Sequence, residues 1–389
     1  MRSCETLQDV PLTVHLAGPS DDDLFITAAV TAAGGGAGET ARRFYERLAS
    51  RAKAQRMHVV HERVFGSLSV RADVLAARRD ALGRQGIDPD GPLTYVQGRP
   101  VWGDGLAGVQ LRLVRPPESS VEVIREGGVP CGRAWTRSGA RFLILQDMSA
   151  EAPCIAGQTR GEQAARMFQR TQAILAAEGA DYTHVVRTWI YLSRLLEWYD
   201  EFNGVRNRIY GGLGLADERG PRLPASTGIE GDNAHGAACM MDVVAVVPLE
   251  GSAVRTSFLG NVRQADAFSY GSAFSRGASI REPHLEQVHI SGTAAVDRQG
   301  RTMHVGDVRG QILSAAESVR SLIGQEGVSL DDICQATLFF KDGDGHGVFR
   351  ALGAESGLAD VPAVVVRADV CRDDWLFEVD GIAARARTP

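Results

Sequence analysis

Apolar and polar residues along the chain follow two periods, and the order of these periods repeats three times. Residues 38–56 carry apolar side chains at helical spacing, residues 58–66 form a β-branched and aromatic run typical of a strand, and residues 71–83 return to the helical pattern. Two more strand-like runs follow at residues 93–97 and 106–114. This pattern predicts helices packed on one face of a mixed sheet.

The same order of elements returns in the middle and near the end of the chain. In the middle, helix, strand, helix and two strands are predicted at residues 161–178, 184–192, 198–210, 226–230 and 238–247. Near the C-terminus, the corresponding elements are predicted at residues 308–327, 332–341, 347–355 and, for both closing strands, 362–383. Leading strands are predicted within residues 122–148 and 287–296, so each unit is expected to run β-β-α-β-α-β-β.

Short segments rich in Pro, Ser and Gly, at residues 116–120 and 249–253, mark the expected joints. They divide the chain into units at residues 1–117, 118–251 and 252–389. One such sheet leaves a face uncovered, and three separate domains would need longer polar linkers than these. We therefore expect an α+β fold in which three mixed sheets pack into a pseudo-trimer with the helices outside. Such a chain buries internally what a trimer buries between subunits, so a monomer is expected.

The amino-acid composition and net charge limit which classes of protein this chain can belong to. The 389 residues are 44% hydrophobic and 23% charged, as in an ordinary globular protein, and the net charge of −6 argues against nucleic acid as the main partner. No apolar run is long enough to span a bilayer and no apolar signal core opens the chain, so we expect a cytoplasmic protein without a membrane partner. The six cysteines lack the spacing of a metal site or a disulfide framework.

The last predicted strand carries the most informative residue. Alternation along the strand places Glu378 and Asp380 on one face, and Trp375 and Phe377 on the other. A carboxylate on a mostly apolar strand is costly to bury. Glu378 is therefore either a paired or edge-exposed acid, or a proton donor whose pKa is raised by burial.

The C-terminal part of the chain resembles a known superfamily. Phe377–Ala383 (Phe-Glu-Val-Asp-Gly-Ile-Ala) is similar to the terminal Glu-x-Glu-Ala-x-Ala strand of the RidA/YjgF superfamily, whose chorismate-mutase-like units form homotrimers with active sites between subunits. Within it, residues 140–389 resemble the chorismatases, which split pyruvate from chorismate. The matching segments are residues 187–191, 202–206, 223–229, 290–294, 305–311 and 369–378. The resemblance implies a small dicarboxylate substrate and neither a metal ion nor an organic cofactor.

The resemblance also implies roles for individual residues. Glu378 is the expected general acid, which protonates the methylene carbon of the enol ether. Its slot is expected to hold Met240 in the second unit and a residue near Gly108 in the first, so one working site is predicted, with the second unit completing it. The expected substrate-binding residues are Arg187, Arg206, Lys341, Arg276 and Arg367, together with Tyr191, which is otherwise a core residue.

Two small residues are expected to select the product. Chorismatases with Gly and Cys at the positions of Gly292 and Cys371 favour 3-hydroxybenzoate, whereas those with Ala at both positions favour a dihydrodiol. Here the resemblance implies 3-hydroxybenzoate as the product.

Two other functions stay open. An imine deaminase of the RidA type needs an Arg after the Pro of the penultimate strand, and none follows Pro92, Pro224 or Pro362. A non-catalytic binding protein of this fold would use Glu378 only as a structural acid.

Overall fold

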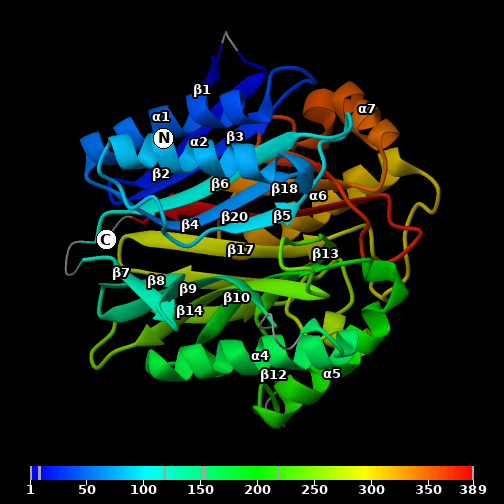
Figure 1. Cartoon of the computed structure of the whole chain (residues 1–389). Helices are drawn as coiled ribbons and strands as arrows, with labels where there is room; N and C mark the ends of the chain where they lie inside the picture. The colour runs from blue at the N-terminus through cyan, green and yellow to red at the C-terminus, as the bar shows by residue number, and fades with distance from the viewer. Residues whose placement is uncertain (1, 8–9, 117–119, 151–154, 218–219, 388–389) are drawn as a thin grey trace.

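The computed structural model describes residues 2–7, 10–116, 120–150, 155–217 and 220–387. It contains three mixed six-stranded sheets, each drawn from one stretch of chain, residues 2–114, 122–248 and 255–386 (Figure 1). This arrangement confirms the predicted α+β fold of three tandem units. The boundaries proposed at residues 117/118 and 251/252 lie between the sheets, and the division into separate domains stays a prediction.

The first sheet has the order β1-β2-β3-β6-β4-β5. Its strands are β1 (Arg2–Leu7), β2 (Leu12–Ser20), β3 (Asp23–Val30), β4 (His58–Gly66), β5 (Thr94–Gln97) and β6 (Leu106–Val114). Two helices, α1 (Ala37–Gln55) and α2 (Arg71–Arg84), cover its outer face.

The second sheet has the order β13-β10-β14-β9-β8-β7. Its strands are β7 (Glu122–Glu126), β8 (Val129–Arg137), β9 (Ala140–Ser149), β10 (Val185–Leu192), β13 (Ala225–Glu230) and β14 (Cys239–Pro248). Its helices are α4 (Arg160–Ala177) and α5 (Tyr199–Gly212), and a small ribbon pairs β11 (Ala216–Asp217) with β12 (Gly220–Pro221).

The third sheet has the order β15-β16-β17-β20-β18-β19. Its strands are β15 (Arg255–Leu259), β16 (Gly277–Arg281), β17 (Leu285–Thr293), β18 (Ile333–Phe340), β19 (Ala363–Arg367) and β20 (Phe377–Ala386). Its helices are α6 (Val308–Gly324) and α7 (Gly343–Leu352). Short 3-10 turns lie at Leu68–Val70, Tyr182–His184, Leu195–Glu197, Ala267–Tyr270, Leu330–Asp332 and Gly353–Ser356.

Each sheet begins with three strands, where the sequence predicted two. The missed edge strands carry a weak apolar signal. In β15, for example, the first three residues are exposed and polar, and short, polar edge strands are typical because an exposed apolar edge promotes aggregation. The helix expected at residues 347–355 begins earlier, at Gly343, where the side chain of Asp342 accepts a hydrogen bond from the Gly345 amide.

The three sheets pack face to face around a central core. One apolar cluster contains residues of all three sheets, among them Phe25, Trp189 and Phe339. Three further clusters each lie between one sheet and its own helices. Arg137 of the second unit ties the centre together, because its guanidinium lies 2.7 Å from Asp23 of the first unit and 2.6 Å from Glu282 of the third. This ion-pair network supports the predicted pseudo-trimer.

A ring of backbone hydrogen bonds also links the units in cyclic order. The last residue of each parallel-paired closing strand donates to a carbonyl of another unit. The three bonds are Gln97 N to Asp232 O (2.9 Å), Glu230 N to Asp369 O (3.0 Å) and Arg367 N to Arg99 O (2.7 Å). The interfaces are thus built alike, and any difference in chemistry between them comes from the side chains. No helix in the described ranges is both long and apolar enough to cross a bilayer.

Candidate active site

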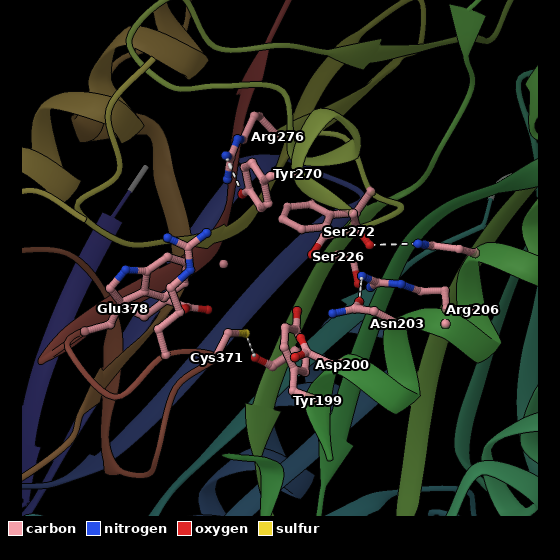
Figure 2. Close-up of a pocket in the computed structure, with 18 residues that line it drawn as sticks. Tyr199, Asp200, Asn203, Arg206, Ser226, Tyr270, Ser272, Arg276, Cys371 and Glu378 are labelled. Atoms are coloured by element: carbon pink, nitrogen blue, oxygen red, sulfur yellow. Dashed lines mark hydrogen bonds between the residues drawn. The ribbon is translucent and has the colours of Figure 1, made fainter. Parts of the chain in front are cut away.

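A cavity of about 360 Å³ lies between the second and third units (Figure 2). The second unit contributes residues of α5 and β13, and the third contributes the 270–276 segment, β17 and the segment that leads into β20. The lining residues include Tyr199, Asp200, Asn203, Arg206, Ser226, Gly228, Tyr270, Ser272, Phe274, Arg276, Gly292, Cys371, Arg372, Trp375 and Glu378. The unit that faces Glu378 is therefore the second.

Glu378 lies on β20 and is only 2% exposed, at the inner end of this cavity. Burial, and the negative charge of Asp380 on the same face of the strand, raise the pKa of Glu378 to about 8, although Arg276 and Arg187 oppose the shift. At neutral pH the side chain is mostly a neutral carboxylic acid that can donate a proton. Trp375 was expected on the opposite face but also lines the cavity, because β20 begins only at Phe377 and alternation does not extend back to Trp375.

Gly292 makes room for this acid. It lies in the irregularity of β17, where the pairing with β20 skips from Ile290 to Thr293. A Cβ atom at this position would lie 2.1 Å from Oε1 and 3.0 Å from Cδ of Glu378. Any larger residue would therefore displace the carboxyl group, which explains in physical terms why this position must be small.

Arg187 lies behind the acid, outside the cavity lining. It is fully buried, and its Nη2 donates to Thr227 Oγ1 (2.5 Å) and to Asp380 Oδ2 (3.1 Å). Its guanidinium also lies 4.5 Å from the ring centre of Trp189. Burial lowers the pKa of Arg187 to about 10 despite the pairing with Asp380. Arg187 therefore acts on Glu378 electrostatically but does not line the cavity.

Arg206 and Arg276 line the cavity from opposite units (Figure 2). Arg206 projects from α5 and its Nη2 donates to Asn203 Oδ1 (2.6 Å). Arg276 donates to Ala265 O from Nε (2.9 Å) and Nη2 (2.7 Å), and Nη2 also donates to the Tyr270 hydroxyl (2.7 Å). Both guanidinium groups are buried and held by neutral acceptors, so their positive charges remain available to an anionic ligand.

Arg372 is a third cation in the wall, and the sequence did not indicate it. Its guanidinium lies 4.8 Å from the Trp375 ring and 5.3 Å from the Tyr270 ring, and its Nη1 donates to Gly300 O (2.8 Å). It directly follows Cys371 within the segment that resembles chorismatases. The only signal for Arg372 in the sequence was its position next to Cys371, a predicted site residue.

Cys371 also reaches the cavity. Its Sγ donates to Gly228 O (3.1 Å), and burial together with the nearby Glu378 raises the pKa of the thiol to about 12. A neutral thiol is a poor nucleophile, so the contribution of Cys371 is its small volume and its contact with β13.

Besides Arg187, three residues predicted to bind substrate lie outside this cavity. Tyr191 is 1% exposed in the central core, 3.4 Å from Arg63 Nη1, because its position on β10 faces the other sheets. Lys341 and Arg367 line a different pocket, where the closing strands of the three units end. The Lys341 ammonium group lies 2.7 Å from Asp373 O and 3.2 Å from Asp373 Oδ1. These residues were expected to bind substrate from the family resemblance, and none of the three lines the cavity that holds Glu378.

The strand registers support the expected slots of the other two units. Glu378 pairs with Phe339 in the third unit, Met240 pairs with Tyr191 in the second, and Gly108 pairs with Phe65 in the first. In every unit this pair lies the same number of residues beyond a corresponding irregularity in the strand pairing. Met240 is fully buried and replaces the acid in the second unit. At Gly108 a Cβ atom would lie 2.4 Å from Ala28 O and 2.7 Å from Val364, so the space in front of it is filled.

No group of three or more His, Cys, Asp or Glu side chains is arranged to hold a metal ion within the part of the chain that the structure describes. Four of the six cysteines, at positions 131, 239, 334 and 371, are free thiols, whereas the side chain of Cys4 and the whole of Cys154 lie outside the described residues.

Comparisons with known proteins agree with this geometry. The family model described as Endoribonuclease L-PSP matches residues 271–385. A chorismatase of Streptomyces hygroscopicus is 26% identical over 286 residues, which are 67% of this chain and 76% of the relative. A chorismatase of Streptomyces rapamycinicus is 27% identical over 232 residues, which cover 52% of this chain and 65% of the relative.

The fold comparison extends over more of the chain. A crystal structure of a chorismatase aligns with a TM-score of 0.58 and 20% identity, covering 84% of this chain and 92% of that one. Because this alignment includes all but a small part of the chorismatase, the shared fold is the whole three-unit arrangement. The shared fold and the sequence matches make this chain similar to chorismatases, and its last unit matches the Endoribonuclease L-PSP family model.

Proposed function

We propose that this enzyme cleaves the enolpyruvyl ether of chorismate and releases pyruvate and 3-hydroxybenzoate. The observation that carries the proposal is Glu378, a buried carboxylic acid whose pKa is raised to about 8, in a cavity lined by three arginines in a chain similar to chorismatases. Cleavage of an enol ether needs one proton donor that is still protonated near neutral pH, and Glu378 meets that requirement.

The first step is proton transfer from Glu378 to the methylene carbon of the enolpyruvyl group. This step makes the adjacent carbon an oxocarbenium ion and leaves Glu378 as a carboxylate. Water or a neighbouring ring hydroxyl traps the ion, and the resulting adduct collapses to pyruvate. In the branch that yields 3-hydroxybenzoate, chorismate divides into two products with no net gain or loss of water, and the proton returns to Glu378.

Arg206 and Arg276 are the proposed partners of the two substrate carboxylates. They lie on walls contributed by different units, so each can bind one of the two carboxylates of the substrate. Arg372 adds positive charge on the side of Arg276. Guanidinium groups can bind a carboxylate through two parallel hydrogen bonds, which fixes the orientation of the substrate relative to Glu378.

Gly292 and Cys371 are the proposed selectors of the product. Gly292 allows the Glu378 carboxyl group to lie against the backbone of β17, and Cys371 fills little of the opposite wall. A larger residue at position 292 would change where the acid is held, and so which atom traps the cation.

The test is direct. Purified protein is incubated with chorismate, pyruvate is followed with lactate dehydrogenase, and the aromatic product is identified by chromatography. We expect both pyruvate and 3-hydroxybenzoate, and neither with Glu378→Gln, whose folding is checked by circular dichroism. If wild-type protein released no pyruvate across a range of pH, the proposal would be wrong, and release of ammonia from 2-imino acids would then favour a deaminase.

A further inference from the structure

A second cavity, of about 440 Å³, lies between the helices of the first unit and strand β8 of the second, and Glu378 does not line it. Its walls are mainly apolar and come from α1, α2, the connection between α2 and β5, and the start of the second unit. The apolar lining residues are Leu48, Ala52, Met57, Val59, Leu82, Ile87, Pro92 and Val121. Concave apolar sites with a few polar groups are typical of small-molecule binding.

Arg133 supplies the distinctive polar group of this cavity. It projects from β8, its side chain is 14% exposed, and its closest carboxylate oxygen is Asp88 Oδ2, at 3.8 Å. Within the described chain its guanidinium donates no hydrogen bond to the protein. A Cβ atom on Gly91 would lie 2.2 Å from Arg133 Nη2, so the glycine lets the guanidinium lie against the α2–β5 connection. A mostly buried guanidinium without hydrogen-bond acceptors is costly unless something supplies them.

Two carboxylates lie in the cavity wall: Asp88 forms only a long ion pair with Arg133, at 3.8 Å, and Glu62 is engaged by other residues. Glu62 lies at the base of the cavity, but it already accepts hydrogen bonds from Arg78 (2.8 Å, at both oxygens) and from Tyr45 (2.6 Å). His58 also lines the cavity, and burial and the positive charge of Arg133 lower its pKa. Lys53 and Arg56 add positive charge at the rim.

The pseudo-symmetry of the chain shows that this arginine is specific to one interface. In the second unit Gly132 of β8 pairs with Leu145 of β9, and in the third unit Gly277 of β16 pairs with Ile290 of β17. Leu145 and Ile290 are equivalent, because each directly precedes the irregularity in the pairing of its strand with the closing strand. Arg133 therefore corresponds to Ala278 of the third unit, and the same register gives Ala17 in the first. Both alanines are buried in the central core. An arginine is thus not required to pack these interfaces.

We propose that this cavity binds an apolar monocarboxylate, such as an aromatic or alicyclic acid, through Arg133. One available guanidinium at the edge of an apolar cavity fits one carboxylate attached to an apolar body. The site is separate from Glu378 and does not depend on the proposed reaction.

Benzoate is the probe, and the side chain of His58 is the reporter. Benzoate also fits the cleft of Glu378, but His58 lines the second cavity and does not line that cleft. In histidine-detected NMR, with the His58 signal assigned from His58→Gln, we expect benzoate to shift that signal and to raise the His58 pKa, because it offsets the charge of Arg133. The uncharged isostere benzamide should bind at least about 10-fold more weakly, since the charge-assisted hydrogen bonds are lost.

Arg133→Ala is the matched variant, because it introduces the residue found at the other two interfaces and should fold normally. It should abolish the effect of benzoate on His58, whereas Arg206→Ala in the catalytic cleft should leave that effect intact. The proposal is overturned if the His58 signal does not respond in the wild-type protein, if benzamide acts equally well, or if the response survives Arg133→Ala.

Discussion

The cleft between units two and three and the corresponding region between units one and two are built from equivalent strands, and two positions set their chemistry apart. In the first, β20 carries Glu378 and the irregularity of β17 carries Gly292, so a carboxyl group lies in open space. In the second, β14 carries the buried Met240, and the irregularity of β9 carries Asp147, whose Oδ2 lies 2.7 Å from His235 Nε2.

This comparison shows that the fold supplies the interface and individual positions supply the chemistry. The deeper polar residues are similar in both regions. Asp380 pairs with Arg187 (3.1 Å) in one, and Asp242 pairs with His61 (2.9 Å) in the other. A buried carboxylate hydrogen-bonded to a basic side chain of the neighbouring unit is therefore common to both interfaces. What distinguishes the candidate active site is an acid at position 378 facing a residue without a side chain.

The largest expected effect is the loss of the acid. Glu378→Gln should reduce kcat by about 10²- to 10⁴-fold, because a positioned general acid contributes an acceleration of that order. Asp147→Asn, the matched change in the other region, should leave turnover within about twofold of wild type, since Asp147 does not line the cavity. Equal losses in both variants, measured as pyruvate release, would show that the two regions are functionally coupled.

Making the active cleft more like its counterpart should also be damaging. Gly292→Ala places a methyl group in the space of the Glu378 carboxyl, and a displacement of about 1 Å can cost about 10²-fold in rate. The product ratio of hydroxybenzoate to dihydrodiol, measured by chromatography, should change in the same variant. Retention of full activity and of the same products would contradict the role proposed for Gly292.

Loss of a substrate-binding cation should have a smaller effect. Arg276→Met should lower kcat/KM by about 10- to 100-fold, because a hydrogen bond to a charged group contributes about 1.5–3 kcal/mol. Lys341→Met serves as the control in steady-state kinetics, since Lys341 lies in a different pocket and should have almost no effect. A large effect of Lys341→Met would instead support Lys341 as a substrate-binding residue.

The smallest expected effect is a shift along the pH axis. In the proposed mechanism Glu378 donates a proton, so activity should be present below its pKa and fall as the pH rises through about 8. Asp380→Asn removes the neighbouring negative charge that helps to raise this pKa, so the alkaline limb of the kcat profile should move to lower pH. A profile that does not move, in a variant that remains folded, would show that Asp380 has no influence on the acid.

The repeated order of helical and strand periods was enough to predict three units and the face of the last strand that carries Glu378, whereas the replacement of this acid by Met240 was implied by the family resemblance. The first two properties depend on local spacing, which the sequence displays directly. The leading edge strands were missed because residues such as those of β15 are short and polar. Arg372 was missed because an arginine in an irregular segment has no periodic signature.

The sequence by itself determined the fold class, the number of units and the position of the acid, because periodicity and the cost of burying a charge act within a few residues of the chain. Tertiary structure alone decided which cations surround that acid. Arg206 and Arg276 come from different units and meet across an interface, whereas Lys341, Arg367 and Tyr191 are directed elsewhere by strand ends and by the central core. The raised pKa of Glu378 likewise depends on burial by two packed sheets, which no short segment of sequence records.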